Sequence, residues 1–203
     1  MRAKWFRRAR AVAIVVAAAA SSSCGEFVRG QGHSPSQLTI MSINTASGTG
    51  GVATSFTSGP LLSDVQDDTG TIFDDFGQAT LRVTLKDLGA PAAPSSPTSF
   101  NDVTISRYRV TYRRSDGRNT AGVDVPRAFD GAMTVTIPAG SSTATVFELV
   151  RHVAKLEAPL AALATNPVVI TTIADVTFFG RDQAGNDVSA TGSVQINFAN
   201  FGG

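Results

Sequence analysis

Residues 188–198 read VSATGSVQINF, and in this stretch apolar and polar side chains alternate without interruption. A period of two residues is typical of a β-strand, whose successive side chains point to opposite faces of the sheet. One face of this strand is therefore expected to pack into a core while the other meets water. The apolar face would carry Val188, Ala190, Gly192, Val194, Ile196 and Phe198, and the polar face Ser189, Thr191, Ser193, Gln195 and Asn197.

The same period recurs along most of the chain after residue 37. It predicts further strands at about 38–43, 81–86, 103–112, 133–137, 143–150 and 170–178. In 103–112 the parity changes between Ile105 and Tyr108, which predicts a β-bulge near Ser106–Arg107. Seven or eight strands with turn-forming residues between them, and no regular alternation with helices, predict an all-β domain: an antiparallel sandwich of two sheets.

Only residues 153–164 (VAKLEAPLAALA) indicate a helix. Leu156, Leu160 and Leu163 recur at helical spacing, and Pro159 interrupts the pattern because proline lacks the N–H that a helix interior needs. We therefore expect one short helical crossover near 153–164.

The segment 178–198 is similar to the last hairpin of bacterial immunoglobulin-like domains, in which a strand ends in D-x-A-G-N. Asp182, Ala184, Gly185 and Asn186 occupy those positions. An aspartate at that place can form an Asx-turn, while Gly and Asn tolerate positive φ. The resemblance implies an immunoglobulin-like sandwich. It is one of architecture, because the chain has one Trp and one Cys and therefore lacks the Cys…Trp…Cys core of antibody-type domains.

The first residues of the chain differ sharply from the rest. Five basic residues and no acid occur in residues 1–10, and ten apolar residues follow at 11–20 (AVAIVVAAAA). Ten helical residues reach about 15 Å, roughly half of what a membrane span needs. A basic segment, a short apolar segment and a small-residue exit form an export signal. We divide the chain into a signal peptide (1–23), a flexible tether (24–36) and a β-sandwich domain (37–203).

Cys24 ends a segment, Ser21–Cys24, that resembles the lipobox of bacterial lipoproteins. In that family the cysteine becomes the first residue of the mature protein and carries lipid on its sulfur. Ser21 departs from the pattern, since leucine is usual there. The resemblance implies an exported protein of the bacterial cell envelope, anchored to a membrane through lipid on Cys24. Cleavage after Ala20, which would leave a free thiol on a secreted or periplasmic protein, is the alternative.

Composition narrows the possible functions. The whole chain has a net charge of +1, but without residues 1–23 it has 12 Lys+Arg and 16 Asp+Glu, a net charge of −4. This balance does not predict a nucleic-acid partner. The single cysteine excludes a disulfide framework and a multi-cysteine zinc site. With only His33 and His152, and no G-x-S-x-G or phosphate-binding glycine loop, we expect no enzyme activity and no cofactor.

Residues 64–77 (DVQDDTGTIFDDFG) form an acidic cluster. Calcium takes six to eight oxygen ligands, and neighbouring carboxylates can supply several of them. Their spacing matches no known calcium loop, so solvated turn formers are the favoured interpretation and a metal site is the minor alternative. The five aspartates are Asp64, Asp67, Asp68, Asp74 and Asp75.

A basic cluster lies on the predicted strand 103–112 and just after it: Arg107, Arg109, Arg113, Arg114 and Arg118. We expect the first three on the outward face, opposite Tyr108 and Val110. Arg107, Arg109, Arg113 and Arg114 could form a face that binds an anionic polymer or an acidic partner. The simpler explanation is that these arginines pair with acids on neighbouring strands and discourage edge-to-edge association.

We therefore expect a non-catalytic adhesion, scaffold or ligand-binding module with a protein or polysaccharide partner. One alternative is an accessory domain that binds carbohydrate or calcium. A hydrolase is less favoured still, because it would require His152 in a pocket with an acid in hydrogen-bond reach.

Overall fold

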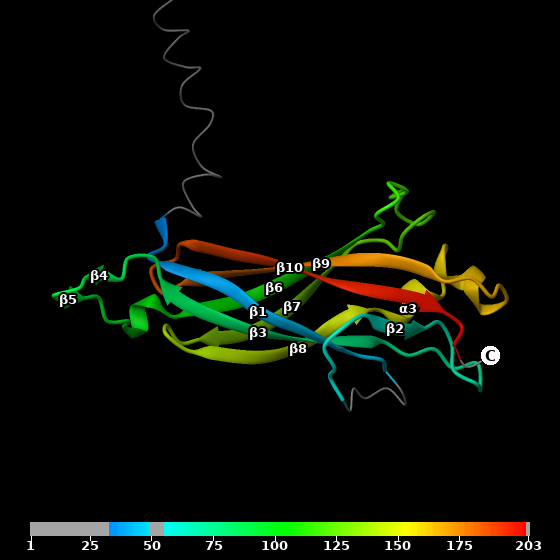
Figure 1. Ribbon diagram of the computed structural model, residues 1–203, viewed down its shortest axis with the longest axis horizontal. Helices are drawn as coiled ribbons and strands as arrows, with labels where there is room; N and C mark the ends of the chain where they lie inside the picture. Colours follow the sequence, from blue (N-terminus) through cyan, green and yellow to red (C-terminus); the bar gives the residue numbers. More distant parts are fainter. Residues whose placement is uncertain (1–32, 49–54, 202–203) are drawn as a thin grey trace, which may run out of the picture.

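A computed structural model describes residues 33–48 and 55–201, and in these ranges the regular secondary structure is mostly β-strand (Figure 1). The all-β class predicted from the alternation is confirmed. Two sheets pack against each other. The small sheet has the order β1-β3-β8 and the large sheet the order β2-β10-β9-β6-β7. All pairings within them are antiparallel except that of β2 with β10, which is parallel.

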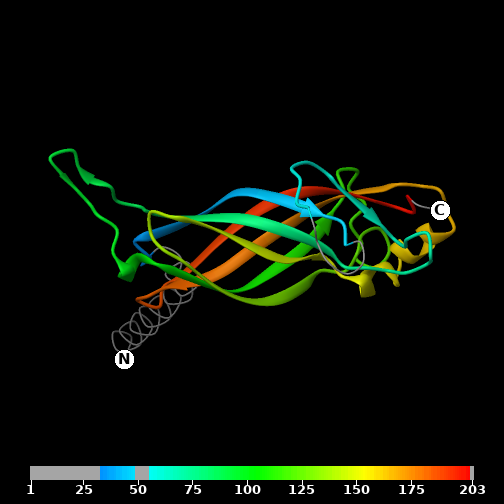
Figure 2. The same ribbon diagram turned by 90° about the horizontal axis from the view of Figure 1, so that it is seen from below.

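The strands are longer than predicted, and three of them were missed. The small sheet consists of β1 (Ser36–Ala46), β3 (Asp75–Leu85) and β8 (Ser142–Val150), and the large sheet of β2 (Leu61–Asp64), β10 (Asp187–Ala199), β9 (Ile170–Asp182), β6 (Val103–Arg113) and β7 (Phe129–Ile137). A two-stranded ribbon, β4 (Gly89–Ala90) with β5 (Ala93–Pro94), extends beyond the body of the sandwich (Figure 2). The sequence did not predict β2, β4 or β5.

The core lies between the two sheets. On β10 the predicted inward residues Val188, Val194, Ile196 and Phe198 are buried, as the alternation requires. Phe147 on β8 and Phe178 on β9 meet edge-on across the core, with ring centroids 5.3 Å apart. Gly77 on β3 makes room for this contact, because a Cβ at that position would lie 2.4 Å from the ring of Phe147.

Bulges on three strands, β6, β8 and β1, interrupt four of the strand pairings. The pairing of β6 with both β7 and β9 shifts between Ile105 and Arg107, so the bulge predicted from the change of parity is confirmed. On β8, Val150 faces Asp75 and Glu148 faces Phe76, which leaves Leu149 as the extra residue. On β1, Met41 is the extra residue.

The predicted helical crossover is two short pieces rather than one helix. α3 (His152–Lys155) is a single turn, and the 3-10 helix η3 (Leu160–Ala164) follows after a break that contains Pro159. Leu160 and Leu163 are buried, but Leu156 is 60% exposed because the break rotates it away from the core. A further 3-10 turn, η2 (Ser99–Asn101), precedes β6. Among the described residues, no helix has the length and apolar character needed to span a membrane.

The β9–β10 turn uses the chemistry predicted from its sequence. The Asp182 carboxylate accepts hydrogen bonds from the backbone N–H groups of Ala184 (3.0 Å) and Asn186 (2.9 Å), and from the Asn186 side chain (2.9 Å). Gly185 has φ of +86°, which suits glycine. Burial alone would raise the pKa of Asp182, but these hydrogen bonds outweigh it and lower the pKa.

The domain begins slightly earlier than the predicted boundary at residue 37. Ser34 and Ser36 are both buried, and the Ser36 hydroxyl donates to the carbonyl of Asn101 at 2.6 Å. These serines therefore belong to the fold rather than to a tether, since their polar groups are bonded inside it. The predicted signal peptide and Cys24 lie outside the described residues.

Candidate functional site

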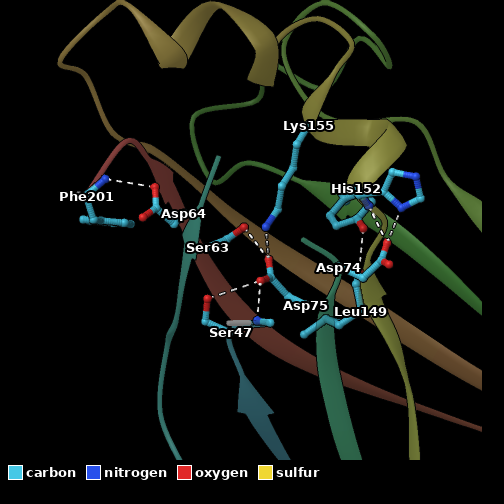
Figure 3. Close-up of polar contacts among 11 residues, drawn as sticks. Ser47, Ser63, Asp64, Asp74, Asp75, Leu149, His152, Lys155 and Phe201 are labelled. Atoms are coloured by element: carbon cyan, nitrogen blue, oxygen red, sulfur yellow. Dashed lines mark hydrogen bonds and ion pairs between the residues drawn. The ribbon is translucent and has the colours of Figure 1, made fainter. Parts of the chain in front are cut away.

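A buried ion pair lies at one end of the sandwich, where α3 crosses the start of β3 (Figure 3). Lys155 Nζ is 2.9 Å from Asp75 Oδ2, and the two side chains are 1% and 0% exposed. Removing two charges from water costs several kcal/mol per ion unless each charge is well bonded. The stability of the buried pair therefore depends on the hydrogen bonds that Asp75 makes with its surroundings.

Each carboxylate oxygen of Asp75 has hydrogen-bond donors. Oδ2 accepts from the Ser63 hydroxyl on β2 at 2.6 Å, in addition to its contact with Lys155. Oδ1 accepts from the backbone N–H of Gly48 at 3.1 Å and from the Ser47 hydroxyl at 3.4 Å. Burial raises the pKa of the Asp75 carboxyl, and Lys155 with these hydrogen bonds offsets the increase only in part.

The neighbouring residue, Asp74, hydrogen-bonds to His152, the first residue of the same short helix. Asp74 Oδ1 lies 2.8 Å from the His152 ring Nδ1 and accepts the His152 backbone N–H at 2.6 Å. Burial would raise the pKa of Asp74, but the two hydrogen bonds from His152 lower it below its ordinary value. Consecutive aspartates thus hold positions 152 and 155, one turn apart on α3, and fix the crossover to the sheet.

The remaining acidic residues make no ion pair with Lys155, although Asp64 and Asp67 line the small cavity that it borders. Asp67 caps its own turn by accepting the N–H groups of Thr69 (2.9 Å) and Thr71 (2.7 Å), and Asp64 accepts the N–H of Phe201 (3.1 Å). Asp68 is exposed. In the described ranges no group of three or more His, Cys, Asp or Glu side chains is placed to hold a metal ion. The interpretation as solvated turn formers fits Asp67 but is wrong for Asp75, which is fully buried.

A hydrolase would require His152 to lie in a pocket and to have an acid in hydrogen-bond reach, and His152 meets only the second condition. It has an acid in hydrogen-bond reach, but its side chain is about half exposed. A small cavity of about 70 Å³ lies close by and is lined by Ser47, Gly48, Asp64 and Lys155, among others, but not by His152. The geometry of this end therefore gives Lys155 and Asp75, rather than His152, the enclosed environment.

The predicted arginines divide into two groups. Arg107 and Arg109 lie outward on β6 and contact the same carboxylate, Asp130 on β7, at 3.4 and 3.2 Å. Arg113 contacts Asp175 on β9 at 2.7 Å, and the guanidinium of Arg107 also lies 3.7 Å from the centre of the Phe179 ring. We call Arg107, Arg109 and Arg113 the arginine face. Their outward position is as predicted, and each is about half exposed.

Arg114 does not belong to the arginine face, contrary to the grouping made from sequence. β6 ends at Arg113, so the strand alternation no longer governs the next side chain. Arg114 contacts Asp116 at 2.6 Å in the following turn, and Arg118 contacts Asp124 at 3.0 Å in the same loop.

Two open grooves follow the sides of the sandwich. One, of about 340 Å³, lies between β7 and β8 and is lined by Tyr108, Met133, Phe147, Glu148 and Arg151, among others. The other, of about 440 Å³, lies between β1 and β10 and carries no charged residue. Neither groove contains any member of the arginine face, so the grooves and the face are separate surfaces.

Sequence reasoning missed Lys155 and its contact with Asp75. One available signal was parity, since Asp75 shares the inward face of β3 with Leu81 and Val83. A second was the position of Lys155 next to the apolar residues Val153, Ala154 and Leu156. No protein-family model matches this chain, and no curated protein matches it either.

Proposed function

We propose that this protein is a non-catalytic, exported module of the bacterial cell envelope that binds an acidic partner, either an anionic polysaccharide or an acidic protein surface, through the arginine face. The observation that carries the proposal is the sharing of one carboxylate by two guanidinium groups. Arg107 and Arg109 both rely on Asp130, at 3.4 and 3.2 Å. Charge-assisted hydrogen bonds are usually about 2.7–2.9 Å long, so these contacts are long.

Replacement of the contacts that Arg107 and Arg109 make with Asp130 by contacts with a ligand anion is physically favourable. A guanidinium has five N–H donors in a rigid fork that fits carboxylate, sulfate or phosphate oxygens. Exposed ion pairs contribute only about 0–1 kcal/mol each, so a ligand anion displaces Asp130 at little cost. Arg113 differs, because its bond to Asp175 is short and Asp175 is also held by Ser193. Arg107 and Arg109 are therefore the residues that would bind the ligand anion first.

The proposed attachment to a membrane fits the placement of the domain's ends. Ser34, where the proposed tether would join the domain, bonds to Asp182 at the β9–β10 turn. The Asp75–Lys155 pair and α3 lie at the opposite end of the sandwich (Figure 1). With lipid on Cys24, the chain would enter the domain at the end of the sandwich that lies opposite α3.

The immunoglobulin-like arrangement is part of the same proposal, and the strand order supports it. β1 pairs with β3 in the small sheet, whereas the next strand, β2, joins the large sheet parallel to the last strand, β10. The N-terminal region thus contributes a strand to each sheet. Antiparallel sandwiches with crossing connections of this kind serve many unrelated binding functions, so the fold alone does not name the ligand.

Binding to two defined polyanions, heparin and polyglutamate, tests the proposal. The full chain is applied to each immobilised polymer and eluted with salt. We expect Arg107→Gln/Arg109→Gln to elute at clearly lower salt than the wild type. The matched control, Arg118→Gln/Arg127→Gln, removes the same charge from the loop that follows β6 and should elute like the wild type. Failure of the wild type to bind either polymer, or an equal loss in both variants, would refute it.

A further inference from the structure

The Asp75–Lys155 contact joins an amine and a carboxyl group in an enclosed, nearly water-free place. Lys155 lies at the end of α3 and Asp75 is the first residue of β3, so the two come from distant parts of the chain. Strands and a helical turn hold Lys155 Nζ 2.9 Å from Asp75 Oδ2, beside a cavity of about 70 Å³. We propose that Lys155 and Asp75 condense to form an intramolecular amide bond.

The burial of the Asp75 carboxyl favours its neutral form, which this reaction needs. An ammonium and a carboxylate do not react, but proton transfer between them gives a nucleophilic amine and an electrophilic carboxylic acid. Low-dielectric surroundings disfavour separated charges, and burial raises the pKa of the Asp75 carboxyl. Asp74 bonds to His152 through Oδ1, and it acts on Lys155 through its charge.

The hydrogen bonds around Asp75 distinguish its two oxygens in the way that the reaction requires. Oδ1 accepts from the Gly48 N–H and the Ser47 hydroxyl, and these donors would stabilise the negative charge that develops on it. Oδ2 is the oxygen next to Lys155 Nζ, and it also accepts the Ser63 hydroxyl at 2.6 Å. Oδ2 is therefore the oxygen placed to leave.

The chemistry balances without a further reactant. The ammonium of Lys155 gives one proton to Oδ2, and the freed lone pair on Nζ attacks Asp75 Cγ. The tetrahedral intermediate then breaks its bond to Oδ2, which leaves as water after taking a second proton from Nζ. Nothing is oxidised or reduced, and the amide keeps Oδ1. Holding two groups in fixed contact replaces a bimolecular encounter and is worth several kcal/mol of barrier.

The released water has a place to go. The cavity of about 70 Å³ is lined by Ser47, Gly48 and Lys155, so it borders both the donors to Oδ1 and the amine. One water molecule occupies about 30 Å³ in the liquid, so the cavity holds it. The cavity also borders Asp64 and Thr71, whose polar groups would hydrogen-bond to that water.

Tryptic digestion of the full chain, followed by mass spectrometry, tests the proposal. Trypsin cuts after Lys and Arg, so an unlinked chain gives residues 30–82, 152–155 and 156–181 as separate peptides. An amide at Lys155 blocks cleavage there and joins residues 152–181 to residues 30–82, with the loss of one water molecule. We expect this branched peptide from the wild type.

The control is Lys155→Arg, which keeps the positive charge but cannot form the amide under the same conditions. Its digest should contain only linear peptides. The wild-type digest decides the question even if the variant folds poorly. Recovery of unmodified 152–155 and 156–181 from the wild type, with no branched peptide, would overturn the proposal. Polymer binding by the arginine face plays no part in this readout, so the two proposals succeed or fail separately.

Discussion

Tyr112 connects the two sheets through one buried hydrogen bond, and its removal gives a quantitative test of how the sandwich is held together. The Tyr112 hydroxyl on β6 donates to the carbonyl of Leu149 on β8 at 2.6 Å. Leu149 is the extra residue of the β8 bulge and has no partner residue on β3. Tyr112→Phe therefore deprives a buried carbonyl of this donor while it keeps the aromatic ring.

The expected cost follows from burial. A buried acceptor that loses its donor costs about 1–3 kcal/mol, and the lower values apply where water can replace the donor. Leu149 is fully buried and Tyr112 is 7% exposed, so water has no access and we expect about 2 kcal/mol. With a urea m-value of about 2 kcal/mol/M, the unfolding midpoint should fall by about 1 M.

The assay is urea unfolding followed by far-ultraviolet circular dichroism, with Tyr108→Phe as the control. Tyr108 is the only other tyrosine and is also on β6. At 4% exposed it is no more exposed than Tyr112 as a whole residue, but it lines the open groove between β7 and β8, where water can replace the lost hydroxyl. We expect its midpoint to fall by less than about 0.4 M at an unchanged m-value. Equal shifts in the two variants would refute the reasoning about burial.

Three further predictions concern separate parts of the chain. Cys24→Ala should move the protein from the membrane fraction to the soluble fraction, and unchanged fractionation would contradict lipid anchoring. Gly77→Ala should lower stability by about 1–3 kcal/mol in urea unfolding, because the new methyl group meets the Phe147 ring at 2.4 Å; a neutral effect would show that the ring moves freely. The pKa of Asp74 is lowered in the fold, so its ionised form stabilises the protein above about pH 4 and this contribution is lost as the pH falls further. The urea midpoint of the wild type should therefore approach that of Asp74→Asn below about pH 4, and a constant difference down to pH 2 would argue against it.

The elements that were predictable from sequence are those fixed by local pattern. The alternation in 188–198 identified β10 and its buried face, and the change of parity after Ile105 located the bulge. The turn at Asp182 was predictable because its hydrogen bonds connect residues within four positions of one another. In each case the physical cause lies within a few residues.

The features that were missed depend on contacts between distant residues. β2 is only four residues long and is a strand because it pairs with the end of β10, far along the chain. Lys155 lies at the end of a single helical turn, and its burial follows from the position of that turn over Asp75 rather than from its own neighbours. Arg114 was misplaced because the end of β6 is fixed by its pairing with β9.

The bulge on β1 has a consequence for the behaviour of many copies together. β1 is the outer strand of the small sheet, and none of its eleven residues is charged. Uncharged outer strands are where sheets of separate molecules can join and grow into fibrils, and proteins commonly prevent this with charged side chains or with β-bulges. Met41 supplies the irregularity here, since it is half-exposed and breaks the spacing of the backbone groups. This single extra residue is therefore expected to oppose edge-to-edge association of separate molecules.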